Sequence, residues 1–190
     1  MGWLPPLIGG LTVVVMLGEL VAPDANAETD LIALVDAAAA RLQTADAVAA
    51  DKWVHGGPIV DPARAGAVLD AVAADARRHG VDPAYVRQVF TDQIRATEGV
   101  EYSRFAQWTL EADSAPAGGR DSAPDLARYR SAIDGLNRTM VTEIAANWDL
   151  LHSAACPATL TGARAAVTGA RRLDPPLTQA LAVATGNYCQ

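Results

Sequence analysis

The chain has 190 residues, of which 51% are hydrophobic and only 5% are aromatic, and its formal net charge is -7. This length is sufficient for one domain with a substantial core. An acidic chain without a long basic run is a poor candidate for a nucleic-acid-binding protein. Abundant alanine and few aromatic residues favour helices over sheets.

The first 27 residues are typical of an export signal. The apolar run within residues 6–22 is followed by Ala25-Asn26-Ala27, a small-x-small cleavage site. No Lys or Arg precedes the run, which is unusual for such a signal, but the run is short for a membrane-spanning helix. A signal peptide over residues 1–27, cleaved after Ala27, is therefore favoured over an uncleaved anchor. We expect a secreted or periplasmic protein whose mature domain spans residues 28–190, with no membrane attachment after cleavage.

The mature region carries helix signals and almost no strand signals. Apolar residues recur at helical spacing between residues 30 and 53. Two helix starts are marked by an aspartate at the N-cap followed by a proline at the first helical position, at Asp61-Pro62 and at Asp82-Pro83. The first of these helices is predicted to end at about residue 78, and the second to continue through residue 108. Beyond a loop over residues 111–124, further helices are predicted at about 125–152, 157–172 and 175–188. The expected fold is all-α, a single domain of about six helices.

The helix that contains residues 85–108 carries polar residues on its apolar face. Four of them project into the stripe that begins at Val86: Gln93, Thr97, Glu101 and Arg104. Thr97 could bond to its own helix backbone. Glu101 could form a structural ion pair with Arg104 or Arg130. These readings explain single residues but not the whole set.

Other helices also direct cations toward the expected core. Arg41 and Lys52 are eleven residues apart, almost three whole turns, so they lie along one line beside the apolar stripe. Arg130 and Asn137 fall inside the stripe of the fourth long helix, and Arg64 occupies a first turn, where the helix dipole disfavours a cation. Any one of these cations could lay its stem on the core and keep its charge in water. Because several buried, unpaired cations would cost several kcal/mol each, the joint pattern predicts a bound carboxylate or phosphate anion.

Other chemistries have little support in the sequence. His55, His79 and His152 are scattered and no CxxC is present, so no metal site is expected. There is no GxSxG, P-loop or GxGxxG motif. In an exported chain, an even cysteine count indicates a disulfide between Cys156 and Cys189, the alternative being two buried free thiols.

Four segments carry a family resemblance: TDQIRATEGVEYSRFAQW, LVDAAAARLQTADAVAADKW, RSAIDGLNRTM and ATGNYCQ. Through them, residues 28–190 resemble the secreted chorismate mutases, the gamma subclass of the AroQ class. The resemblance implies an all-α homodimer, with a complete site in each subunit, that converts chorismate to prephenate without a cofactor. It implies that Arg41 and Arg130 hold the two carboxylates of the substrate, and that Lys52 and Glu101 face its ether oxygen. It also implies a polar wall completed by Asp61, Arg64 and Thr97.

One position departs from the family pattern, because a glutamine one turn after Arg64 is replaced by Val68. The resemblance then implies a changed contact at the ring end of the substrate. Glu101 can donate to an ether oxygen only when it is protonated, so we expect its pKa to be raised by burial and by hydrogen bonding to the neutral form. The alternatives are an exported anion-binding or interaction protein that has lost catalysis, and a purely structural helical protein.

Overall fold

The computed structural model describes residues 1–2, 31–116 and 126–190. The predicted signal peptide, apart from its first two residues, and the predicted cleavage site after Ala27 lie outside these ranges. All secondary structure in the described ranges is helical, which confirms the predicted all-α class. The elements are α1 (Ile32–His55), α2 (Pro62–His79), α3 (Pro83–Leu110), the 3₁₀ helix η1 (Ala112–Ser114), α4 (Leu126–Ala146), α5 (Trp148–Leu151), α6 (Cys156–Arg171) and α7 (Pro175–Ala184).

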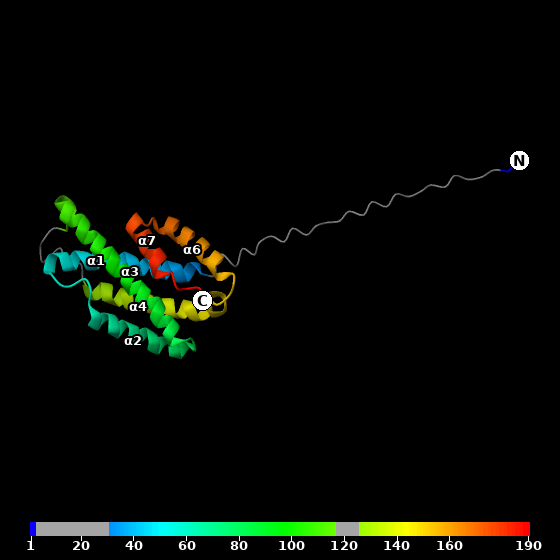
Figure 1. The fold of residues 1–190 in the computed structure, drawn as a ribbon, viewed down its shortest axis with the longest axis horizontal. Coiled ribbons are helices and arrows are strands. Elements are labelled where there is room, and N and C mark those ends of the chain that lie inside the picture. The colour runs from blue at the N-terminus through cyan, green and yellow to red at the C-terminus, as the bar shows by residue number, and fades with distance from the viewer. Residues whose placement is uncertain (3–30, 117–125) are drawn as a thin grey trace.

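Helix α1 lies at the centre of the bundle, where it contacts α3, α4, α6 and α7. Figure 1 shows α2 on one side of α1 and the α6–α7 pair on the other. The core is formed by aliphatic and aromatic side chains that repeat at helical spacing and are fully buried, including Leu34, Val35, Leu42, Val86, Phe90, Met140 and Ile144.

The predicted helix starts are confirmed by their capping bonds. The Oδ1 atom of Asp61 accepts a hydrogen bond from the backbone N–H of Arg64 at 3.0 Å, and that of Asp82 accepts one from Ala84 at 2.9 Å. Gly80, with a φ of 73°, ends α2 in the left-handed conformation that glycine adopts without strain. Such signals are local, which is why the sequence alone was sufficient to find them.

The fourth and last predicted helices are shorter than expected. The predicted helix over 125–152 is interrupted at Asn147, whose φ of -107° and ψ of 19° separate α4 from α5. The side-chain amide of Asn147 donates to the Glu143 carbonyl at 2.9 Å, a local bond that competes with a regular helix. The last helix ends at Ala184 rather than near residue 188, because the chain then turns to bury Tyr188.

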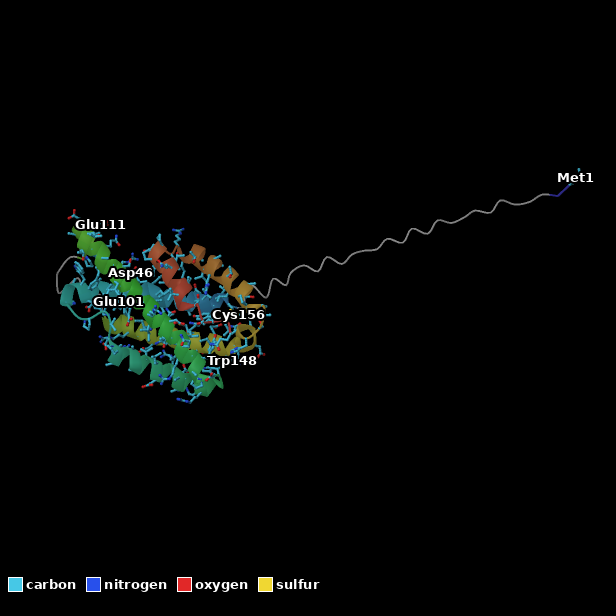
Figure 2. The ribbon with its side chains drawn as sticks, in the orientation of Figure 1. Met1, Asp46, Glu101, Glu111, Trp148 and Cys156 are labelled. Carbon is cyan, nitrogen blue, oxygen red and sulfur yellow. A yellow bond between two sulfur atoms is a disulfide. The ribbon has the colours of Figure 1, made fainter. Side chains whose placement is uncertain are left out.

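The C-terminal segment is tied to the bundle by covalent and polar contacts. Cys156 and Cys189 form the predicted disulfide, which joins the start of α6 to the segment after α7. The hydroxyl of Tyr85 donates to the Tyr188 carbonyl at 2.6 Å, and the N–H of Gln190 donates to a carbonyl of α5 at 3.1 Å. In Figure 2, Cys156 lies at one end of the bundle and Glu101 toward the other, so the disulfide is remote from the cavity that Glu101 lines.

Among the helices that the structure describes, none combines the length and the apolar character needed to cross a membrane.

Candidate active site

A cavity of about 550 Å³ is enclosed by α1, α2, α3, α4 and the loop between α1 and α2. Its lining includes Val68 and every residue predicted to form the site: Arg41, Lys52, Asp61, Arg64, Thr97, Glu101 and Arg130. The fold therefore brings together residues that lie up to 89 positions apart in the sequence, between Arg41 and Arg130.

Arg41 is a buried cation, with 5% of its surface exposed. Its Nε atom donates to Oδ1 of Asn137 at 2.8 Å, and its Nη1 atom donates to Oγ1 of Thr97 at 3.1 Å. Both partners are neutral, and no carboxylate in the described parts of the chain lies within 4.0 Å of this guanidinium. Burial lowers the pKa of Arg41 to about 10, although the more distant negative charge of Asp134 opposes the shift. The cavity thus contains a desolvated positive charge that an anion would stabilise.

Lys52 and Glu101 form an ion pair at the cavity wall. The Nζ atom of Lys52 donates to Oε2 of Glu101 at 2.7 Å and to the backbone carbonyl of Ile59 at 3.0 Å. The Glu101 side chain is 4% exposed and that of Lys52 is 20% exposed. Burial raises the pKa of Glu101, although the hydrogen bond and positive charge of Lys52 oppose the shift. The raised pKa of Glu101 agrees in direction with the expectation from the sequence. The ion-pair partner of Glu101 is Lys52, however, and not Arg104 or Arg130.

The mouth of the cavity carries more exposed charges. Arg64 and Asp134 are about half exposed and lie 3.6 Å apart, a distance at which a surface pair is weak. Asp61 lines the cavity while capping α2. Arg130, near the start of α4, is exposed. The exposed Arg64 and Arg130 side chains can move toward a ligand with little cost, whereas Asp61 is held by its capping bond and Arg41 by Asn137 and Thr97.

Two of the polar residues that α3 directs inward do not line the cavity. Arg104 donates to Asp46 at 2.7 Å and to Asp174 at 2.6 Å, and these carboxylates raise its pKa, with Asp46 the largest cause. Gln93 is fully buried and donates to the Ala38 carbonyl at 3.1 Å. Both are therefore structural, in contrast to Thr97 and Glu101 on the same helix.

Several cavity residues were not predicted from the sequence. Glu98 follows Thr97 directly and lies three residues before Glu101, so helical spacing could have identified it. Tyr129, which precedes Arg130, also lines the cavity, and no feature of the sequence distinguished it as a site residue. The Ile59 carbonyl is a backbone group and has no signature in the sequence.

The loop between α1 and α2 depends on two glycines. Gly56 and Gly57 have φ values of 79° and 126°, a region that residues with a Cβ rarely adopt. They reverse the chain after His55 and bring the Ile59 carbonyl to Lys52. The loop thereby helps to orient the ammonium group.

The site is suited to binding an anion and to stabilising negative charge. In the described residues, no group of His, Cys, Asp and Glu side chains is arranged to hold a metal ion. Both cysteines are in the disulfide and cannot act as nucleophiles. The chemistry that the arrangement can supply is therefore electrostatic, from fixed cations and hydrogen-bond donors around a partly apolar cavity.

Comparison with known proteins finds similarity to chorismate mutases in both sequence and structure. The sequence pattern of the family described as chorismate mutase type II matches residues 32–102. A protein named secreted chorismate mutase from Mycolicibacterium smegmatis is 52% identical over 170 residues, which cover 88% of this chain and 92% of the relative. Another of that name, from Mycobacterium tuberculosis, is 46% identical over 166 residues, covering 87% and 81%. The crystal structure of chorismate mutase from Burkholderia phymatum matches with a TM-score of 0.81 at 29% identity, covering 87% of this chain and 99% of that one.

Proposed function

The chain belongs to the chorismate mutase family, and from this premise we propose that its cavity converts chorismate to prephenate by a cofactor-free Claisen rearrangement. The observation that carries the proposal is Arg41, a buried cation that faces the cavity without a carboxylate partner among the described residues. A dicarboxylate substrate supplies the missing negative charge. The bidentate fork of arginine is well matched to a carboxylate.

The rearrangement is unimolecular, since one C–O bond breaks while one C–C bond forms within the same molecule. It needs no nucleophile and no transferred proton, which fits a site built from cations and hydrogen-bond donors. Arg41 and Arg130 would clamp the two carboxylates and hold the flexible side chain over the ring in the reactive conformation. Thr97, Asp61 and Arg64 would complete the polar wall.

Lys52 has the donors needed to stabilise the breaking bond. An ammonium group has three N–H donors, and two of them are used by Glu101 and by the Ile59 carbonyl. The third would reach the ether oxygen, where negative charge grows in the transition state.

Glu101 would contribute a second donor in its protonated form. Its Oε2 atom can accept from Lys52 whether or not the carboxyl is ionised. A proton on Oε1 would then point to the substrate, whereas a carboxylate would repel the ether oxygen. Burial, which raises the pKa of Glu101, favours this state.

We also propose that the protein is exported and dimeric. The signal-like residues 1–27 and the relatives named as secreted support export, and the small-x-small sequence Ala25-Asn26-Ala27 is the basis for proposing cleavage after Ala27. The disulfide is consistent with an oxidising compartment. The homodimer is implied by the family resemblance, and light scattering on the purified mature chain would test it.

The decisive experiment follows the ultraviolet absorbance of chorismate with oxidised, purified protein. Wild type should consume chorismate, and Lys52→Ala should lower kcat by roughly 100- to 1,000-fold, the usual effect of removing one such donor. Arg95→Ala is the matched control, because Arg95 is an exposed cation on α3 that does not line the cavity. A folded wild type that binds a transition-state mimic without turnover would instead favour the non-catalytic, anion-binding alternative.

A further inference from the structure

Asn137 is a buried polar residue of α4 that the rearrangement itself does not require. It is 7% exposed and lies on the face that also buries Met140, Val141 and Ile144. A side-chain amide in such a place needs a hydrogen-bond partner. Its Oδ1 atom accepts from Nε of Arg41 at 2.8 Å, across 96 residues of sequence. Asn137 does not line the substrate cavity, and the one side-chain hydrogen bond that it makes among the described residues is to Arg41, which does.

The bond from Asn137 determines which part of the guanidinium remains available. Arginine has five N–H donors in one plane. Asn137 uses the donor on Nε and Thr97 uses one on Nη1. Among the described residues none accepts from Nη2, so the end of the group formed by Nη1 and Nη2 can take a carboxylate in bidentate fashion.

An amide is the side chain best suited to this position. A carboxylate there would also fix Nε, but it would neutralise the charge that attracts the substrate. An apolar residue would leave a buried N–H donor of a cation unsatisfied. The amide oxygen holds Nε without cancelling the positive charge. Thr97 is in turn fixed, because its hydroxyl donates to the Gln93 carbonyl at 2.8 Å.

We propose that Asn137 is a positioning residue, which holds the Arg41 guanidinium so that its free end meets a carboxylate of the substrate. The identity of that carboxylate rests on the proposed function, whereas the positioning of Arg41 does not. The two can therefore fail separately.

The test is a double-mutant cycle of Asn137→Leu and Arg41→Ala, with chorismate turnover as the readout. Leucine has the same number and branching of side-chain heavy atoms as asparagine but accepts no hydrogen bond. Asn137→Leu should lower kcat/KM by roughly 10- to 100-fold, mainly through KM, because one charge-assisted bond that aligns Arg41 is lost. In the Arg41→Ala background the same change should have almost no further effect. Asn147→Ala, which removes a half-buried amide further along the chain, should leave both constants unchanged.

Two results would overturn the proposal: a wild-type KM for Asn137→Leu, or losses that multiply in the double variant. A second readout is independent of turnover. The Nε–H signal of Arg41 in a nitrogen–proton correlation spectrum should exchange slowly in wild type and rapidly in Asn137→Leu. If wild type does not consume chorismate, the proposed function fails, while this signal still decides whether Asn137 holds Arg41. If Asn137→Leu does not fold, Asn137→Asp, whose carboxylate also accepts from Nε, should keep the slow signal, and rapid exchange in this variant would refute the positioning role.

Discussion

Arg41 and Arg104 both point into the helical bundle, yet replacing each by methionine should have opposite consequences. Among the residues that the structure describes, Arg41 is bound only by the neutral groups of Asn137 and Thr97, and burial lowers its pKa. The pKa of Arg104 is raised, because two carboxylates stabilise its charge. The first arginine should therefore matter for activity and the second for stability.

The structure gives the size of each effect on stability. The lowering of the Arg41 pKa to about 10 corresponds to about 3 kcal/mol of unfavourable charge burial at neutral pH. Arg41→Met removes this cost, but it also removes two hydrogen bonds worth about 1 kcal/mol each and leaves the Asn137 oxygen without its donor, at about 1 kcal/mol or more. The terms nearly cancel, so the free energy of unfolding should change by no more than about 1 kcal/mol.

Arg104→Met should lower the free energy of unfolding, because it removes an arginine whose charge is paired with two carboxylates. The side chain is 14% exposed, and its partners Asp46 and Asp174 are 46% and 37% exposed. Because solvent screens these carboxylates, the lost bonds should cost about 1 to 2 kcal/mol in total rather than the full value for buried pairs. Activity should remain near the wild-type level, since Arg104 does not line the cavity.

Urea unfolding, followed by tryptophan fluorescence and circular dichroism, would measure both variants, and chorismate turnover would be measured on the same samples. Arg41→Met should lose at least roughly 1,000-fold in kcat/KM while unfolding near the wild-type urea midpoint. Destabilisation by more than about 3 kcal/mol would show that Arg41 is a structural residue and would refute the argument from its lowered pKa.

Three further predictions concern the chemistry and the fold. Because burial raises the pKa of Glu101, its neutral form persists to higher pH than that of a free glutamate. The kcat of wild type should therefore fall as pH rises through this pKa. Glu101→Gln keeps a hydrogen-bond donor at every pH and should stay active in alkali. Loss of turnover by a folded Glu101→Gln at every pH would contradict the role of a protonated donor. Val68→Gln, at a buried cavity position, should lower KM several-fold with little change in kcat, and an unchanged or higher KM would show that no substrate group lies there. Replacing Cys156 and Cys189 by alanine should lower the free energy of unfolding by about 3 to 4 kcal/mol, because the disulfide joins residues with a sequence separation of 33. Turnover by the folded fraction of this variant should equal that of wild type.

The sequence determined the helices where the signal was local. Asp61-Pro62 and Asp82-Pro83 mark the starts of α2 and α3, because capping bonds reach only two or three residues along the chain. The break at Asn147 was missed, since asparagine occurs inside many helices and the apolar pattern continues across it. The seven predicted cavity residues were found because helix patterns and the family resemblance single out polar side chains near the core, whereas Glu98 and Tyr129 were missed.

The pairing of those polar side chains was decided only by the tertiary structure. Arg41 and Arg104 are alike in the sequence, as cations on apolar helix faces. Arg104 finds Asp46 and Asp174 at sequence separations of 58 and 70, while Arg41 finds a neutral amide at a separation of 96. A helical pattern specifies the direction in which a side chain points but not the group that it meets there, because that group lies on another helix. Whether a buried cation is neutralised or left available for a substrate therefore follows from how the helices pack.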